Sequence, residues 1–430
     1  MNMNIFKKTL FLVPALLLAS CNFKYTYVIS GLVNDNTEQQ EEGEVDDAGT
    51  YNVKVWVDDK IVSLTQSQIQ GFVNDNPRYS LNVTIEPVSE ALAANNMLQD
   101  VQEGADIFVF AQDQLSRLKV AGALAKVTGS YATSLYEEMS EEAVQAATVN
   151  SDIYAFPITS DNGYFLYYDK QVVSDEQAKD MTSLLAACKA AGKTLNFEAR
   201  SNGFYAASYF MATGCYSSWN LNSKTGKFES YEDNYNSTKG LIAAKGLSEL
   251  DDKTTVAANS QASRLGNTSA ACVSGIWEYE TAESRLGKDR LGCAPLPSFT
   301  VDGESYHLSS FDGYKLLGVK PQVDPKKASV CRRIAKYLTS QACQEERFEQ
   351  ASWGPTNKKA FELPSVKAHK GLSALVEQHK YAKPQGQCPG SWFTALATTA
   401  KAITHGASDA KLSEILKNYE VGLPELLDAD

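Results

Sequence analysis

The chain of 430 residues has few of the side chains from which catalytic centres are usually built. It contains only four histidines, and none of them stands in an HExxH sequence. A GxSxG sequence, a phosphate-binding Walker loop and a GxGxxG fingerprint are also absent. The common signatures of zinc hydrolases, serine hydrolases and nucleotide-binding enzymes are therefore missing, and we predict a protein without catalytic residues.

Cysteine is present, but not in a pattern that binds metal. No CxxC pair occurs, which argues against a zinc ribbon. The acidic pair Asp58 and Asp59 has no partner ligands at a recognisable spacing, so we interpret it as polar ligand-binding groups or a solvated turn. We expect neither a metal nor an organic cofactor. Beyond Cys21 an odd number of thiols remains, which leaves at least one unpaired. Cys272 and Cys293 either form a disulfide or remain a reduced buried pair.

Positive charge and long apolar runs are also scarce. The formal net charge is -12, which argues against a nucleic-acid partner and against simple electrostatic adhesion to anionic lipid. No stretch approaches the run of about 18 apolar residues that a membrane-spanning helix needs. The chain is longer than the roughly 250–300 residues that one hydrophobic core usually serves, so we expect two domains.

The N-terminus has the features of an export signal. Lys7 and Lys8 precede an apolar run, 10–18, which is too short to cross a bilayer of about 30 Å as a helix. Residues 1–20 are therefore predicted to be a signal peptide. The sequence Leu-Ala-Ser before Cys21 is similar to a bacterial lipobox, which implies cleavage before Cys21 and lipid on that residue. The alternative is an ordinary signal peptide with a structural Cys21.

An acidic segment follows the lipobox. The sequence TEQQEEGEVDD (37–47) is almost without apolar side chains, a composition typical of disorder. We therefore predict that residues 21–50 form a lipidated cysteine and a disordered tether.

Strand and helix patterns alternate along the next hundred residues. Strands are expected at 53–57, 81–86 and 105–110, with helices at 63–74 and 89–103 between them. This order predicts a parallel sheet covered on both faces. A second lobe of the same kind is expected to begin after residue 152. The predicted fold class is therefore α/β, with two lobes that each contain a mostly parallel sheet flanked by helices.

The stretch 269–297 places a tryptophan at the end of a strand. The apolar run 270–273 suits a short buried strand, Gly275 interrupts it, and a helix is expected from Glu278 onward. Trp277 then lies where open α/β sheets bind ligands. The alternative is that Trp277 is a core residue.

Aromatic residues next to polar groups recur at the ends of elements. They are Trp56 with Asp58, Asp59 and Lys60; Phe110 with Asp113; Asn202 with Phe204 and Tyr205; Trp277 with Glu278; and Trp392 with Phe393. Aromatic rings stack on the apolar faces of sugars, while carboxylates and amides bind hydroxyl groups. We therefore expect a carbohydrate-binding cleft, to which Asp113, Asp161 and Asn162 would contribute polar groups.

The order of several stretches resembles the extracellular solute-binding proteins of the maltose-binding-protein type, the receptors of ABC sugar importers. The stretches are KVWVDDK (54–60), DIFVFAQDQLSRLKVAGAL (106–124), FPITSDNGYFLYYDK (156–170) and AACVSGIWEY (270–279), followed by CAPLPSF (293–299) and the turn at 353–355. The resemblance covers 53–393. It implies two lobes that close over a ligand and are joined by three crossovers near 159–163, 297–301 and 352–355. The first lobe would comprise 51–159 and 299–352, and the second 160–298 and 353–430.

The resemblance also implies roles for individual residues. It implies polar sugar contacts in the first lobe at Asp59, Lys60 and Asp113, with Asp58 beside them, and ring contacts at Phe110, Phe204, Trp277 and Trp392. Asp161 roughly matches a cleft carboxylate of the family, with Ser160 or Asn162 as alternatives because an extra residue lies nearby. Gln114 and Leu396 stand where the family has arginines, which leaves the identity of the sugar open.

These observations predict a monomeric lipoprotein anchored to the outside of the cell membrane. It would capture a small-molecule carbohydrate, with maltodextrin or a related oligosaccharide as the leading ligand, and deliver it to the permease subunits of an ABC importer. Three alternatives remain open. The same fold could bind a peptide, a polyol phosphate or another solute; the chain could be a surface glycosidase that uses Asp59 and Asp113; or it could be a structural or adhesive lipoprotein.

Overall fold

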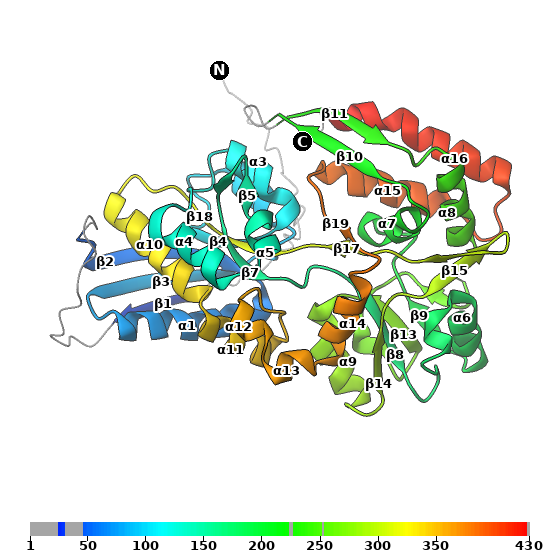
Figure 1. The fold of residues 1–430 in the computed structure, drawn as a ribbon, viewed down its shortest axis with the longest axis horizontal. Helices are drawn as coiled ribbons and strands as arrows, with labels where there is room; N and C mark the ends of the chain where they lie inside the picture. Colours follow the sequence, from blue (N-terminus) through cyan, green and yellow to red (C-terminus); the bar gives the residue numbers. More distant parts are fainter. Residues whose placement is uncertain (1–24, 31–45, 223–226, 252, 428–430) are drawn as a thin grey trace, which may run out of the picture.

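A computed structural model describes residues 25–30, 46–222, 227–251 and 253–427. In it the chain forms two lobes that lie side by side, each with a sheet and helices packed against it (Figure 1). This arrangement confirms the predicted two-lobed α/β class. The predicted signal peptide and Cys21 lie outside the described residues.

The first lobe is built on a six-stranded sheet in the order β1-β3-β2-β4-β18-β7. Strands β2, β3, β4 and β7 run in one direction, while β1 and β18 run in the other. Strand β4 is buried on both faces, as its apolar sequence IFVFA predicts. The strands are β1 (Tyr25–Ser30), β2 (Gly49–Val57), β3 (Tyr79–Pro87), β4 (Ile107–Ala111), β7 (Phe156–Thr159) and β18 (Lys315–Val319).

Helices cover this sheet, with α1 packed against β3, α2 against β4, α5 against β7 and α10 against β18. Helix α3 ends at Val120, and Gly122 just after it adopts a φ of +70°, which turns the chain away from the helical path. The remaining elements on this side are η1 (Asp59–Ile61), α1 (Val62–Asp75), α2 (Ala93–Gln99), η2 (Gln112–Gln114), α3 (Leu115–Val120), α4 (Gly129–Glu138), α5 (Glu141–Ala146), β5 (Thr148–Val149), β6 (Asp152–Ile153), α10 (Pro325–Leu338), α11 (Gln341–Ala351) and α12 (Lys358–Phe361).

Two described parts of the segment 21–50 are ordered, which differs from the predicted tether. Strand β1 pairs with β3 along its whole length. Asp47 is buried and accepts hydrogen bonds from the hydroxyl groups of Tyr79 and Ser329, at 2.7 Å each, and forms an ion pair with Arg333 at 3.0 Å. The composition of the segment did not reveal these partners because they come from residues distant in sequence.

The second lobe is built on a five-stranded sheet in the order β12-β9-β13-β8-β14. Four of these strands run in one direction and β8 runs against them. The strands are β8 (Phe165–Asp169), β9 (Thr194–Asn196), β12 (Val256–Ala257), β13 (Ser269–Ser274) and β14 (Leu291–Ala294). Two hairpins form separate two-stranded sheets: β10 (Ser217–Leu221) with β11 (Phe228–Asp233), and β15 (Ser298–Val301) with β16 (Glu304–His307).

Helices α7, α8, α15 and α16 pack on one another in this lobe, while α6, α9 and α14 contact the sheet. The helical elements are η3 (Gln177–Lys179), α6 (Met181–Ala190), α7 (Gly203–Ala212), α8 (Thr238–Ser248), η4 (Ala262–Arg264), η5 (Ile276–Glu278), α9 (Tyr279–Leu286), α13 (Pro364–Lys367), α14 (Lys370–Gln378), α15 (Gly390–Ala402), α16 (Asp409–Gly422) and η6 (Leu423–Leu427).

The chain passes between the two sheets three times. The first crossing follows β7, at 160–164. The second lies at 308–314, later than the predicted 297–301, because Phe299 and Val301 of β15 are packed in the core of the second lobe. The third runs from residue 352 through α12 and α13 to α14. Between the lobes, β17 (Phe311–Asp312) pairs with β19 (Lys383–Pro384) (Figure 1).

The cysteines of the described residues are all free thiols. Cys272 on β13 and Cys293 on β14 both lie opposite Tyr167 on β8, one on each side of it. Two strand spacings, about 9–10 Å, exceed the reach of a disulfide. Of the two alternatives for this pair, the structure therefore shows the reduced one.

Candidate functional site

A cavity of about 540 Å³ lies between the two lobes. This volume falls within the range of about 300–1,000 Å³ that is typical of small-molecule sites. Its lining comes from three parts of the chain. The first lobe contributes Glu90, Asn95, Asp113 and Arg117; the second contributes Asn202, Phe204, Trp277 and Phe393; and Asn162 and Gln385 lie at the crossings between them.

The second lobe presents an aromatic wall to this cavity. The side chain of Asn202 caps α7 by accepting a hydrogen bond of 3.0 Å from the amide of Phe204, which fixes Phe204 in the first turn. Gly203 permits α15 to approach, because a Cβ atom there would lie 2.1 Å from the carbonyl oxygen of Phe393. The ring centroids of Phe204 and Phe393 are consequently 6.3 Å apart, and Phe204 also stacks on Phe311 at 5.2 Å.

Trp277 lies in η5, directly after β13, as its position in the sequence predicts. Its side chain is half-buried and lines the cavity. Gly275 is required for this ring position, since a Cβ atom at residue 275 would lie 2.1 Å from the indole ring. The structure therefore favours the ligand-facing interpretation of Trp277 over the core interpretation, and contact with a ligand stays a prediction.

Asp113 offers an unused hydrogen-bond acceptor in the wall of the first lobe. One of its carboxylate oxygens is buried and has no hydrogen-bond partner within the described residues. Burial raises the pKa of this carboxyl group to about 6, although its own backbone amide and Arg117 act in the opposite direction. A ligand hydroxyl at this position would supply the missing donor.

Hydrogen bonds join the two lobes beside the cavity. Lys60, in η1, donates to the backbone carbonyl of Trp277. Gln387, just before α15, accepts a bond of 3.2 Å from the amide of Ser116 and donates one of 3.1 Å to the carbonyl of Gln112. The structure is therefore that of a closed cleft.

Comparison with known proteins identifies the family. The model of a family described as bacterial extracellular solute-binding protein matches residues 74–374. The chain belongs to this family. No curated protein sequence matches it.

Solved structures show the same fold at low sequence identity. A protein solved with acarbose is 23% identical with a TM-score of 0.76, covering 88% of this chain and 100% of its own. The maltodextrin-binding protein MalE1 of L. casei BL23 is 19% identical with a TM-score of 0.69, covering 88% and 98%. The GacH receptor of Streptomyces glaucescens, also solved with acarbose, is 18% identical with a TM-score of 0.70, covering 88% and 98%.

Two of the expected ring contacts of this solute-binding protein are wrong. Trp392 is 4% exposed, and its indole donates a hydrogen bond of 2.9 Å to the hydroxyl group of Tyr419 in the core of the second lobe. Its neighbour Phe393 reaches the cavity instead. Phe110 is completely buried in the core of the first lobe, against Phe108. Adjacent residues on a helix or strand face different directions, and the resemblance did not show which of them faces the ligand.

Asp161 and Asn162 hold the crossings together. Asp161 is fully buried and accepts hydrogen bonds from the hydroxyl group of Thr159 at 2.7 Å and from the amide of Gly354 at 2.6 Å. It therefore ties the first crossing to the third and does not line the cavity. Asn162 does line the cavity, and its side chain donates to the side chain of Gln385 at 2.9 Å. Of the alternatives near this position, the structure favours Asn162.

The group 58–60 lies at the edge of the site. Asp58 is half-buried and accepts a hydrogen bond of 3.0 Å from the amide of Lys60, while the side chains of Asp59 and Lys60 are exposed. Asp59 does not line the cavity that contains Asp113, so the structure does not bring together the two carboxylates of the glycosidase alternative.

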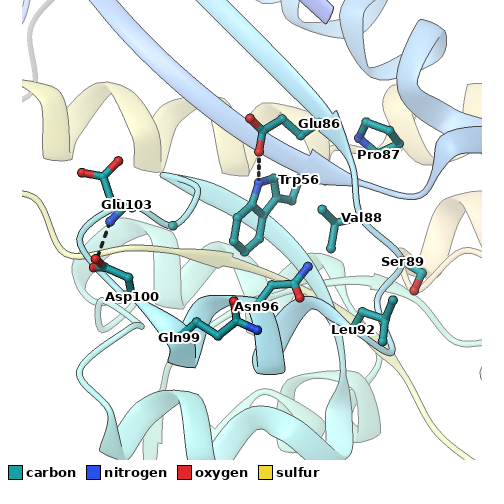
Figure 2. A pocket seen from close by; sticks show the side chains of 11 residues that line it. Trp56, Glu86, Pro87, Val88, Ser89, Leu92, Asn96, Gln99, Asp100 and Glu103 are labelled. Carbon is teal, nitrogen blue, oxygen red and sulfur yellow. Dashed lines mark hydrogen bonds between the residues drawn. The ribbon is translucent and has the colours of Figure 1, made fainter. Parts of the chain in front are cut away.

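Trp56 lines a separate cavity, of about 490 Å³, within the first lobe (Figure 2). Its indole donates a hydrogen bond of 2.7 Å to Glu86, and its ring lies near Asn96 of α2. The pairing of Trp56 with the group 58–60 in the sequence therefore does not correspond to a shared site.

Within the described ranges, no three or more histidine, cysteine, aspartate or glutamate side chains converge to form a metal site. In the same part of the chain, no helix is both long enough and apolar enough to cross a membrane.

Sequence reasoning missed Glu90, Asn95, Arg117 and Gln385. Glu90 and Gln385 lie in loops without a regular pattern. The direction in which their side chains point therefore depends on contacts with distant parts of the chain. Arg117 had a usable signal, since it follows Asp113 by one helical turn and therefore shares its face.

Proposed function

We propose that this solute-binding protein captures a carbohydrate in the cavity between its lobes and delivers it to an ABC importer. The observation that carries the proposal is the combination of three rings, those of Phe204, Trp277 and Phe393, with the unsatisfied carboxylate of Asp113. Rings provide a surface for the apolar face of a sugar, and carboxylates and amides accept its hydroxyl protons. The family binds solutes, so we propose that the site binds its ligand without catalysis.

Maltodextrin or a related oligosaccharide is the leading ligand. Similar structures include a maltodextrin-binding protein and proteins solved with acarbose. Among the described residues Arg117 is the only basic side chain that lines the cavity, which disfavours a phosphate. A neutral ligand therefore suits the site better than an anionic one.

The decisive experiment is a thermal-shift screen of the mature protein. Maltose, maltotriose and maltotetraose are compared with a tripeptide and with glycerol 3-phosphate, before and after dialysis against EDTA. A ligand at about one hundred times its Kd stabilises the folded state by about 2.7 kcal/mol, which raises Tm measurably. A shift with a peptide or phosphate and with none of the sugars would refute the carbohydrate assignment. Loss of the sugar shift after EDTA dialysis would refute the prediction that no metal is needed.

We also propose that lipid on Cys21 anchors the protein at the outer face of the membrane. The support is the lipobox-like sequence before Cys21 and the extracellular family. Intact mass of detergent-extracted protein should correspond to a chain that begins at acylated Cys21. A mass without acyl groups would contradict the anchor and leave the binding proposal unchanged.

A further inference from the structure

A lysine lies buried where the two lobes and their crossings meet. Lys315 is the first residue of β18, and the residue is 1% exposed. Burying an ammonium group is costly unless opposite charges and other partners compensate. Its Nζ atom lies 2.7 Å from a carboxylate oxygen of Glu90 and 3.9 Å from one of Asp161. It also lies 3.9 Å from the ring centroid of Trp353 and 5.8 Å from that of Trp277.

These four partners belong to different parts of the molecule. Glu90 lines the cavity from the first lobe, and Trp277 lines it from the second. Asp161 lies in the first crossing and Trp353 in the third. Lys315 itself is the residue that directly follows the second crossing. One ammonium group therefore contacts both walls of the cavity and the chain segments that connect them.

The contact with Glu90 determines the charge of that side chain. Burial would raise the pKa of Glu90, but the charge of Lys315 and its hydrogen bond outweigh burial and hold the pKa below its ordinary value. Glu90 is therefore an ionised acceptor in the cavity at neutral pH. Asp113, on the same wall, has a pKa of about 6, because the charge of Arg117 does not outweigh its burial.

The contact with Trp277 restricts its ring. The distance of 5.8 Å is within the range in which a cation is attracted to the face of an indole, about 6 Å. Lys60 holds the backbone of the same residue from the first lobe. Trp277 is thus fixed by two lysines of the opposite lobe.

We infer that Lys315 is a positioning residue for ligand binding, which fixes the Glu90 carboxylate and the Trp277 ring on opposite walls of the closed cavity. This inference rests on the proposed function in so far as the ligand is a sugar. Lys315 does not line the cavity itself and acts through these two side chains.

The test compares Lys315→Met with a control, Lys320→Met. Lys320 lies in the same lobe, just after the other end of β18, and is also buried, but its Nζ atom donates to the carbonyls of Gln102 and Gly104, away from the cavity. Because Lys315→Met leaves Glu90 without its cation, the neutral double variant Lys315→Met/Glu90→Gln is measured beside it. Two readouts are used for each folded protein: calorimetric titration with maltotriose, and acrylamide quenching of Trp277, isolated by subtracting the signal of the same protein with Trp277→Phe.

We expect Trp277 to become more accessible to acrylamide in both Lys315 variants and the maltotriose Kd to rise about tenfold, which corresponds to about 1.4 kcal/mol. Lys320→Met should leave both unchanged. Unchanged quenching and affinity in the double variant would overturn the inference, as would equal changes in Lys320→Met. If wild type binds no maltotriose, the sugar assignment fails, and the quenching readout alone decides the role of Lys315.

Discussion

Two tryptophans that look alike in the sequence occupy different environments in the structure. Trp277 is half-buried at the cavity, whereas Trp392 is packed in the core and bonded to Tyr419. We expect Trp277→Ala to raise the Kd for sugar by roughly tenfold or more with little loss of stability, because it removes a stacking surface. Trp392→Ala should cost about 3–5 kcal/mol of unfolding free energy. Urea unfolding and sugar titration of each variant check both, and the reverse pattern would contradict the assignment.

Asp113 gives the protein a pH-dependent stability. Its pKa of about 6 in the folded state exceeds the ordinary value of 3.8. The contribution of Asp113 to the free energy of unfolding is therefore most favourable below about pH 4 and is lost as the pH rises through about 6. Asp113→Asn keeps the shape and removes the charge. We expect the variant to be more stable than wild type at pH 8, by up to about 3 kcal/mol, and equally stable near pH 4.

Urea midpoints at the two pH values check this prediction. The same variant should bind sugar more weakly at pH 8, because a carboxylate is a stronger acceptor than an amide. A variant that is less stable than wild type at pH 8 would show that the carboxylate has a partner in the folded state.

Single residues were the hardest part of the site to predict from the sequence. Trp277 was placed correctly because the strand before it is short and ends at Gly275, so its position follows from local pattern alone. Phe393 and Trp392 could not be separated, because the choice depends on Tyr419, which lies in a helix formed later in the chain. Lys315 gave no local signal, since its four partners come from four distant segments.

At the scale of elements, the aromatic wall depends on how closely α7 and α15 approach. Gly203→Ala would place a methyl group against the backbone carbonyl of Phe393, an atom that cannot move without its helix. We expect a loss of about 1–3 kcal/mol in stability and weaker sugar binding, because Phe204 and Phe393 are displaced. Gly422→Ala, in α16, is the matched control, since nothing lies within 4 Å of its added Cβ atom. Equal effects of the two substitutions would contradict this explanation.

The elements themselves were largely predictable. The alternation of apolar strands and amphipathic helices from β2 to β4 correctly predicted the parallel part of the first sheet. It could do so because buried and exposed side chains follow a regular pattern along these elements. The placement of β1 and of the second crossing was not predictable, since each is fixed by tertiary partners. For β1 the partner is β3, and for the crossing it is the packing of Phe299 in the second lobe.

At the scale of the whole molecule, we expect stability not to depend on disulfides. The cysteines of the described residues are free, and burial raises the pKa of Cys188, Cys293 and Cys331 to about 12, which keeps their thiols protonated. We expect the urea midpoint to be the same with and without dithiothreitol. A lower midpoint under reducing conditions would reveal a disulfide.

The position of β18 between β4 and β7 has a consequence for biogenesis. Both neighbouring strands are synthesised long before β18. They do not pair with each other, so they become part of one sheet only when β18 pairs with both of them. A nascent chain that ends before residue 315 therefore cannot complete the sheet of its N-terminal half. We therefore expect the first lobe to fold only after most of the chain has been made, in contrast to a lobe built from one continuous segment.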